Sequence, residues 1–503
     1  MKFIAYDLGT GGVKASLHND DLGTLAKTFI EYKTYYSGPN MHEQRPADWW
    51  QGIIGSTAKL LAASGTSPKE VSCVSLSGHS LVTVPIDKDR NVLMEQVPIW
   101  SDTRAAEEAM EFFQKIDYTD WYMTTGNGFP APCYSIFKLI WLKKHSPSIF
   151  YKIDKVLGSK DFINFMLCGQ IFTDPSYASG TGAYQLLEGK MSTGFLEAAG
   201  IPLSFFPVIK PSHSIIGYIN KKTAEITGLA EGTAVACGGV DNACMALGAV
   251  GPNEGKIYTS LGSSSWIPVN STKPVLDPIK RPYVFAHIQE SLFTSAFSIF
   301  SGGSSLRWVR ETICREIKDE NNPYQIMDSM AEAVPVGSHG ILFNPSLAGG
   351  TSQDKSVNIR GAYVGLHLGT TREDLIRSAM EGIALGLRMS LDFLKEHTEL
   401  SDEILFCGGG SKSSFWMQMF ADIFNMDIIK TNIDQDAASF GAAAIAARAV
   451  GKWKDYSGMA ALHRIEHKST PDKATVEEYA LLFKKFVHMS NVMADLGDYM
   501  QTT

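Results

Sequence analysis

Two segments of the sequence, about half a chain apart, share one layout: an apolar run, a turn rich in glycine and hydroxyl side chains, and a second apolar run. They span residues 3–17 and 255–267 of a 503-residue chain. Short apolar runs bounded by glycine predict buried strands, so each segment is expected to form a strand–turn–strand hairpin. Coincidence is one explanation, because such hairpins are common. The likeness of the two turns favours the other, an internal duplication of one α/β unit.

Between the two hairpins, residues 232–250 form the stretch that points most directly to chemistry. An apolar run with a β-branched residue predicts a buried strand, and Gly238 and Gly239 allow a tight turn after it. Asp241 and Asn242 come next, ahead of small residues that predict a closely packed helix. A carboxylate at the end of a strand lies where open α/β sheets bind ligands. The alternative is that Asp241 only caps the next helix.

The first hairpin carries a charged residue where its first strand ends. Asp7 follows the apolar run, and the turn after it contains Gly9, Thr10 and Gly11. The backbone N–H groups of such a turn can hold phosphate oxygens, and Thr10 adds a hydroxyl. A plain hairpin turn is the alternative. Burying a carboxylate is costly unless it meets a cation, so Asp7 is a candidate ligand for Mg²⁺.

Two further turns have the features of a nucleotide site. The turn of the second hairpin repeats the glycine and hydroxyl pattern of the first. The other turn follows a predicted strand at 403–407 and begins with three glycines, which let a flat ligand lie against the backbone near a helix N-terminus. Together with the first hairpin, these turns supply the candidate ATP contacts, which are Gly9, Thr10, Gly11, Lys14, Gly262, Ser263, Ser264, Gly409, Gly410, Ser411 and Ser413.

A polar and aromatic cluster is predicted at the ends of neighbouring strands. The apolar run at 71–76 leads to His79 and Ser80, and Trp100 and Asp102 precede a predicted helix. A stacking ring beside hydroxyl-binding groups suits a sugar or polyol. The alternative for Asp102 is the N-cap of that helix. The candidate substrate contacts are His79, Ser80, Trp100, Asp102, Asp241 and Asn242.

Composition restricts the class of partner. Lys+Arg 45 against Asp+Glu 53 gives a net charge of −8, without a basic block, so neither nucleic acid nor a membrane is an expected partner. The seven cysteines include no CxxC pair, which predicts reduced thiols and a cytoplasmic protein. Residues 1–4 lead directly into a predicted strand, so no signal peptide is expected, and no apolar run reaches membrane-spanning length. The motifs GxxxxGKS/T, GxGxxG, HExxH and GxSxG are missing.

The motifs, in their order along the chain, resemble those of the FGGY family of carbohydrate kinases. The resemblance runs from residue 7 to about residue 450, and the second family signature is nearly complete. The segments similar to the two phosphate motifs, the central GGxDN, the adenosine motif and the two signatures are 7–10, 260–264, 238–242, 408–413, 135–145 and 361–382.

The resemblance implies a fold and a division of the chain. The fold is α/β, the duplicated actin/hexokinase/Hsp70-type ATPase fold, which is ribonuclease H-like and has two lobes with a central cleft. The N-terminal lobe, residues 1–246, is expected to bind the sugar and to carry the first phosphate motif. The C-terminal lobe, residues 247–503, is expected to bind the nucleotide.

The resemblance also implies roles for single residues. The family's GGxDN aspartate is the catalytic base, which corresponds to Asp241, and its sugar-contacting Trp and Asp correspond to Trp100 and Asp102. The pattern is nearest to the xylulokinase branch. Leu81, however, stands where that branch has a sugar-contacting histidine, and Ser101 replaces an asparagine. Ribulose, gluconate, glycerol, erythritol and tetrulose therefore stay open beside xylulose.

We expect an ATP- and Mg²⁺-dependent kinase that transfers the γ-phosphoryl group to a hydroxyl of a ketose or polyol. An actin-like switch that hydrolyses ATP slowly is an alternative from another class, and the polar-aromatic cluster near Asp241 argues against it. A binding-only pseudokinase is a third, which the presence of Asp7 and Asp241 disfavours. A homodimer is left open by the sequence. Residues 271–290, which are rich in proline, are expected to be mobile.

Overall fold

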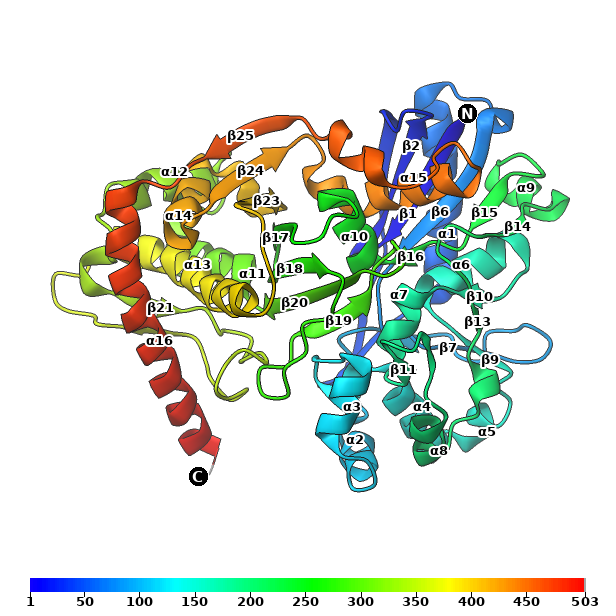
Figure 1. Cartoon of the computed structure of the whole chain (residues 1–503), viewed down its shortest axis with the longest axis horizontal. Coiled ribbons are helices and arrows are strands. Elements are labelled where there is room, and N and C mark those ends of the chain that lie inside the picture. Colours follow the sequence, from blue (N-terminus) through cyan, green and yellow to red (C-terminus); the bar gives the residue numbers. More distant parts are fainter. Residues whose placement is uncertain (502–503) are drawn as a thin grey trace.

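The computed structural model describes residues 1–501 and forms two lobes, each built around a seven-stranded sheet (Figure 1). In the N-terminal lobe the strand order is β14-β15-β6-β1-β2-β3, and β16 also pairs with β6. The strands β1, β6 and β15 are parallel, whereas β2, β3 and β14 run antiparallel to their neighbours. The strands of this sheet are β1 (Lys2–Leu8), β2 (Gly12–Asn19), β3 (Thr24–Glu31), β6 (Val71–Gly78), β14 (Ile215–Tyr218), β15 (Ala234–Ala236) and β16 (Gly239–Val240).

The sheet of the C-terminal lobe repeats this arrangement in the order β19-β20-β18-β17-β23-β24-β25. Here β17, β23 and β24 are parallel and the flanking strands are antiparallel. The hairpin β1–β2 with β3 thus corresponds to β17–β18 with β20, so the predicted duplicated, two-lobed α/β fold is confirmed. The strands are β17 (Ile257–Leu261), β18 (Ser265–Ser271), β19 (Tyr283–Ala286), β20 (Phe293–Ile299), β23 (Glu403–Cys407), β24 (Asp427–Thr431) and β25 (Ile465–Ser469).

Helices cover the sheets, and the remaining short strands form small sheets of two or three strands. None of the helices within residues 1–501 is both long and apolar enough to cross a bilayer. The helices are α1 (Pro46–Ser64), α2 (Ala106–Phe113), α3 (Tyr118–Thr125), α4 (Ser135–His145), α5 (Pro147–Phe150), α6 (Ser159–Cys168), α7 (Pro175–Ala178), α8 (Thr193–Ala199), α9 (Lys221–Thr227), α10 (Asp241–Val250), α11 (Gly302–Thr312), α12 (Pro323–Glu332), α13 (Arg372–His397), α14 (Ser414–Phe424), α15 (Ala437–Ala449) and α16 (Lys473–Gln501). The short strands are β4 (Tyr35–Gly38), β5 (Met41–Gln44), β7 (Val84–Ile86), β8 (Val97–Pro98), β9 (Lys155–Leu157), β10 (Phe172–Thr173), β11 (Tyr184–Gln185), β12 (Lys190–Met191), β13 (Val208–Ile209), β21 (Leu342–Asn344) and β22 (Ala362–Val364).

Two helices, α10 and α15, pack on each other between the lobes (Figure 1). Although α15 comes from the C-terminal half of the sequence, it lies on β1 and β6 of the N-terminal lobe. The helices touch where both have glycine, at Gly248 and Gly441. A Cβ on Gly441 would meet the carbonyl oxygen of Cys244, so the backbones approach too closely for a side chain. The boundary predicted between residues 246 and 247 lies inside α10.

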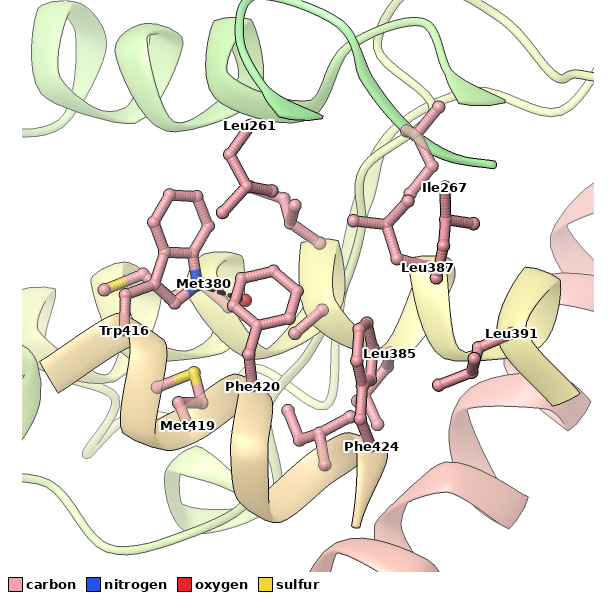
Figure 2. Close-up of a cluster of buried hydrophobic side chains, with 14 of the residues drawn as sticks. Leu261, Ile267, Met380, Leu385, Leu387, Leu391, Trp416, Met419, Phe420 and Phe424 are labelled. Atoms are coloured by element: carbon pink, nitrogen blue, oxygen red, sulfur yellow. Dashed lines mark hydrogen bonds between the residues drawn. The ribbon is translucent and has the colours of Figure 1, made fainter. Parts of the chain in front are cut away.

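The core of the C-terminal lobe fixes the turn that follows β23. Figure 2 shows α14 packed on α13, with Trp416, Phe420 and Phe424 directed into the core. The indole N–H of Trp416 donates a hydrogen bond to the carbonyl oxygen of Met380 (3.2 Å). Because Trp416 lies in the first turn of α14, this contact sets the position of the helix start next to the three glycines.

Residues 271–290, whose proline content predicts mobility, are held by hydrogen bonds to the N-terminal lobe. They contain β19, which pairs with β20. The Tyr122 hydroxyl donates to the carbonyl oxygen of Pro282 (2.8 Å), and the N–H of Val284 donates to the carbonyl oxygen of Gly126 (2.8 Å). These are contacts between distant parts of the chain, and local composition carries no sign of them.

Candidate active site

Asp241 is the first residue of α10, and the turn that places it there depends on glycine. The chain leaves β15 through Gly238, whose φ of 74° is left-handed. A Cβ at this position would also meet the carbonyl oxygen of Leu76 in β6. The Asp241 carboxylate accepts a hydrogen bond from the N–H of Asn242 (2.8 Å). Since Val240 is the N-cap of α10, the alternative that Asp241 caps the helix is wrong.

Asp241 and Asp7 lie close enough for their charges to interact. Burial raises the pKa of Asp241 from 3.8 to about 7, and the charge of Asp7 adds to the rise. Burial also raises the pKa of Asp7, against the opposing charge of Lys14 on the neighbouring strand. The Ser77 hydroxyl donates to Oδ1 of Asp7 (2.7 Å). The two carboxylates therefore stand together at the carboxyl ends of parallel strands, the edge at which such sheets bind ligands.

Because the pKa of Asp241 is raised in the folded protein, this residue lowers the free energy of unfolding as the pH rises above the usual pKa of an aspartate. Between about pH 4 and 7 the folded protein keeps a proton on Asp241 that the unfolded chain has released, so stability falls as the pH rises. Asp241→Asn should remove this loss and make the metal-free variant more stable than the wild type at pH 8. We expect a gain on the order of 1–3 kcal/mol, less than the full shift would give because Asp241 is partly exposed.

Urea unfolding of metal-free wild-type and Asp241→Asn protein at pH 5 and pH 8 measures this effect. The difference between the two proteins should be larger at pH 8 than at pH 5. An equal difference at both pH values would show that Asp241 titrates normally.

The candidate sugar and phosphate residues meet at Thr10. The indole N–H of Trp100 donates to Oγ1 of Thr10 (2.9 Å), and the side-chain amide of Gln44 donates to the Thr10 carbonyl oxygen (2.7 Å). Trp100 follows β8 and is partly exposed. Because Thr10 belongs to the turn that follows Asp7, the Trp100 ring lies at the same end of the sheet as the carboxylate pair.

His79 is buried behind this surface. Its Nδ1–H donates to the carbonyl oxygen of Leu8 (3.1 Å), and its ring packs edge-on against Trp49. Burial lowers the pKa of His79 to about 4, so the imidazole is neutral at pH 7. Ser80, the next residue, is partly exposed. Of these two candidate sugar contacts, Ser80 is therefore the one nearer the surface.

Asp102 is also buried, and its carboxylate is occupied by protein groups. Arg104 donates from Nε to Oδ1 (2.9 Å) and from Nη2 to Oδ2 (2.7 Å), and the N–H of His42 donates to Oδ2 (2.8 Å). The helix α2 has Ala105 at its N-cap, so the alternative that Asp102 caps this helix is wrong. The Asp102–Arg104 pair orders the loop that contains Trp100.

A buried lysine in the segment 135–145, which is similar to the first family signature, joins the two loops of this site. Lys138 donates from Nζ to the carbonyl oxygens of Leu81 (2.8 Å) and Ile99 (2.6 Å). Leu81 has a left-handed φ of 61°, and its side chain is buried in the apolar cluster of the N-terminal lobe. The Leu81 side chain therefore packs into the protein core.

A pocket of about 470 Å³ in the C-terminal lobe contains much of the candidate nucleotide site. Of the candidate ATP contacts, the structure brings five together in its lining: Gly262, Ser263, Gly409, Gly410 and Ser413. Ser411 is buried and donates to the carbonyl oxygen of Gly408 (2.8 Å), while Ser264 is exposed outside the lining. Trp416 also lines the pocket, so the core contact in Figure 2 supports one of its walls.

Other residues of this pocket were missed by sequence reasoning. They come from α11, α12 and the segment between them, and they include Gly303, Arg307, Tyr324 and Asp328. The N–H of Gly303 donates to the carbonyl oxygen of Gly262 (2.9 Å), which places the start of α11 against the second hairpin turn. Paired glycines at a helix start were a signal that could have identified this element.

The candidate ATP contacts Gly9, Thr10, Gly11 and Lys14 belong to the other lobe, and a short loop connects them to the pocket. Lys14 donates from Nζ to the carbonyl oxygen of Gln435 (3.3 Å), and Lys27 forms an ion pair with Asp436. In the same loop, Asp434 accepts from the N–H of Gly408 (2.8 Å), at the start of the three-glycine turn. The first hairpin and the three-glycine turn are thus held by one loop.

A duplicated sheet, a pocket lined by glycine turns in one lobe and a carboxylate pair at the sheet edge of the other are the features expected of a two-lobed phosphotransferase. Comparison with known protein families agrees with this class of enzyme and identifies the family. The models of the N-terminal and C-terminal domains of the FGGY family of carbohydrate kinases match residues 2–248 and 257–450. The chain belongs to this family and is a sugar phosphotransferase that uses ATP, which confirms the kinase interpretation over the actin-like switch.

Similar proteins include kinases of different sugars. The chain is 30% identical to the xylulose kinase of Bacillus subtilis over 504 residues, which covers 100% of this chain and 99% of that protein. It is 26% identical to the gluconokinase of the same organism, over 99% of this chain and 98% of the other. Among solved structures, the xylulose kinase of Rhodospirillum rubrum matches with a TM-score of 0.90 and 27% identity, over 99% and 100% of the two chains.

Proposed function

We propose that this kinase transfers the γ-phosphoryl group of MgATP to a primary hydroxyl of a ketose, with xylulose as the leading substrate and Asp241 as the general base. The observation that carries the proposal is the Asp241 carboxylate itself, with a pKa of about 7, at the start of α10 beside Asp7. The similarity to xylulose kinases supports the choice of sugar, and the similarity to gluconokinases makes gluconate the second candidate.

The base is needed because the attacking alcohol is neutral. As the sugar oxygen bonds to the γ-phosphorus, the bond from that phosphorus to the bridging oxygen of ADP breaks, and Asp241 takes the hydroxyl proton. General bases work best when their pKa lies near the working pH, and their contribution is typically about 10²- to 10⁴-fold. A pKa of about 7 suits this task better than the usual 3.8 of an aspartate.

Asp7 fits the role of a ligand for Mg²⁺. Its carboxylate oxygens are the donors that this ion prefers, and the neighbouring charges of Asp241 and Asp436 favour a cation there. Mg²⁺ often takes only one or two carboxylates together with phosphate oxygens. This agrees with the lack, among residues 1–501, of any cluster of three or more His, Cys, Asp or Glu side chains suited to a metal. When bound, Mg²⁺ neutralises charge that develops on the phosphoryl oxygens.

The remaining candidate residues divide between the two substrates. The Gly262–Ser263 turn and the Gly9–Thr10 turn would hold phosphate oxygens from opposite lobes, and Gly409 and Gly410 would lie against the adenosine. Trp100 would stack on the sugar, with Ser80 and Asn242 as polar contacts. His79 and Asp102, which are buried, would act by holding the loops that contain Ser80 and Trp100.

A coupled ADP assay over xylulose, ribulose, gluconate, glycerol, erythritol and a tetrulose tests the proposal. We expect the highest kcat/KM with xylulose, and sugar-dependent ADP release by Asp241→Asn that is about 10²- to 10⁴-fold slower than by the wild type. A higher kcat/KM with gluconate or glycerol would make that compound the substrate in place of xylulose, and it would not affect the assignment of Asp241 as the base. Sugar-dependent turnover by Asp241→Asn near the wild-type rate would contradict the role of the base.

We also propose that the reaction takes place in the cytoplasm. Support comes from the seven cysteines, which are all free and buried, as expected of a protein from a reducing compartment. The sequence leaves a homodimer open, and sedimentation of the purified protein would test it.

A further inference from the structure

A buried group of charges lies behind the turn that leads to Asp241, and the reaction described above does not use it. Lys160 on α6 has its Nζ 2.6 Å from Oδ1 of Asp161 and 3.1 Å from Oδ1 of Asp174. All three side chains are at most 2% exposed. Desolvating three charges is costly unless each is paired, so a cluster of this kind needs a close arrangement of its partners.

The charge cluster fixes Asp174, and Asp174 in turn fixes a serine. Oδ2 of Asp174 accepts hydrogen bonds from the hydroxyl of Ser176, from the hydroxyl of Ser212 (2.9 Å) and from the N–H of Ser176 (3.0 Å). Because the Ser176 hydroxyl donates its proton to Asp174, its oxygen lone pairs are directed elsewhere. One of them accepts from the N–H of Val240 (3.0 Å), the residue directly before Asp241.

The same elements hold the rest of this turn. Lys160 Nζ and the side-chain amide of Asn164, both on α6, donate to the carbonyl oxygen of Cys237 (3.3 and 2.8 Å). A Cβ on Gly239 would lie 3.3 Å from Oγ of Ser176, so the serine also packs against the glycine turn. Gly238 and Gly239 have no side chains of their own to set the position of the backbone. The contacts from α6 and α7 therefore add to the pairing of β16 with β6 and to the hydrogen bond from the Gly238 N–H to the carbonyl oxygen of Ser212 (2.9 Å).

We propose that Ser176, oriented by Asp174, is a positioning residue that aims the Asp241 carboxylate at the sugar hydroxyl through the N–H of Val240. The inference rests on the proposed role of Asp241 as the base. Misplacing a reacting group by about 1 Å can cost about 10²-fold in rate. Removing the hydroxyl that accepts the Val240 N–H is therefore expected to lower kcat. The candidate nucleotide pocket, which lies in the other lobe, should be unaffected.

Ser176→Ala tests this, with Ser212→Ala as the matched control. Both variants remove one hydroxyl from Oδ2 of Asp174, but only Ser176 contacts the N–H of Val240. We expect Ser176→Ala to lower kcat about 10- to 100-fold with the KM for ATP unchanged, and Ser212→Ala to stay within about threefold of the wild type. Equal losses in the two variants, or wild-type kcat in Ser176→Ala, would overturn the proposal.

A double-mutant cycle separates positioning from a general weakening of the fold. In the Asp241→Asn background the added Ser176→Ala change should cost no further activity in single-turnover assays, because the group that Ser176 positions has lost its function. Losses that multiply would show a merely structural role. If Ser176→Ala fails to fold, Ser176→Cys, which keeps a weaker acceptor, takes its place and is expected to have a kcat between those of the wild type and Asp241→Asn.

The two proposals fail in distinguishable ways. Turnover by Asp241→Asn near the wild-type rate overturns the base assignment and with it the role of Ser176. A strongly impaired Asp241→Asn together with a fully active Ser176→Ala overturns only the positioning role.

Discussion

Asp241→Asn is expected to lower kcat for sugar phosphorylation by about 10²- to 10⁴-fold, the usual contribution of a general base. Asparagine keeps the size and the acceptor oxygen that meets the Asn242 N–H, but it cannot take the proton of the sugar hydroxyl. The candidate nucleotide pocket lies in the other lobe, so ATP should bind within about threefold of the wild-type affinity. Steady-state kinetics and nucleotide titration of the same protein measure both quantities.

The matched control is Asp120→Asn. Asp120 also lies in the first turn of a helix, α3, but it is exposed. Its replacement should leave kcat unchanged. If Asp120→Asn and Asp241→Asn lost activity equally, charge at a helix start would explain the result and proton transfer would not.

Gly441→Ala is expected to destabilise the protein by about 2–3 kcal/mol, because the new Cβ would meet the backbone of α10 at Cys244. Neither helix can move away easily, since α15 lies on β1 and β6 while α10 continues from the glycine turn at Asp241. Any shift of α10 also displaces Asp241, so kcat should fall together with stability. Urea unfolding and steady-state kinetics of the purified variant measure the two effects.

Gly194→Ala is the control for that substitution. Gly194 is also helical, in α8, and a Cβ there has nothing within 4 Å. Alanine has the higher helix propensity, so this variant should be as stable as the wild type or more stable by less than about 1 kcal/mol. Destabilisation of both variants to the same extent would mean that the contact between α10 and α15 is not what excludes a side chain at 441.

Much of the fold could be predicted because its signals are local. The two hairpins, the strand before Gly238 and the three-glycine turn each combine an apolar run with glycine, and the structure places all of them as strand and turn. The position of Asp7 and Asp241 at one sheet edge also follows from such signals, because Asp7 lies near the end of β1 and Asp241 directly after β16, and both strands are parallel neighbours of β6.

What the sequence could not indicate depends on contacts between distant residues. The local pattern around Asp102 allowed a helix cap, whereas the carboxylate is bound by Arg104 and by the backbone of His42, 60 positions away. Lys138 lies in the signature-like segment 135–145, and only the folded chain shows that its ammonium group holds two loop carbonyls. The residues from α12 that line the nucleotide pocket have no local pattern that marks them.

The placement of α15 on the N-terminal lobe has a consequence for how the duplicated halves depend on each other. A polypeptide ending near residue 250 would lack α15, and the side chains of Phe3, Ala5 and Cys73 that α15 helps to bury would face water. In a polypeptide that starts near residue 257, the alanine-rich face of α15 would be exposed to water. The two copies of the ancestral unit are therefore obligate partners: fragments made separately should aggregate, and fragments made together should reassemble into one enzyme.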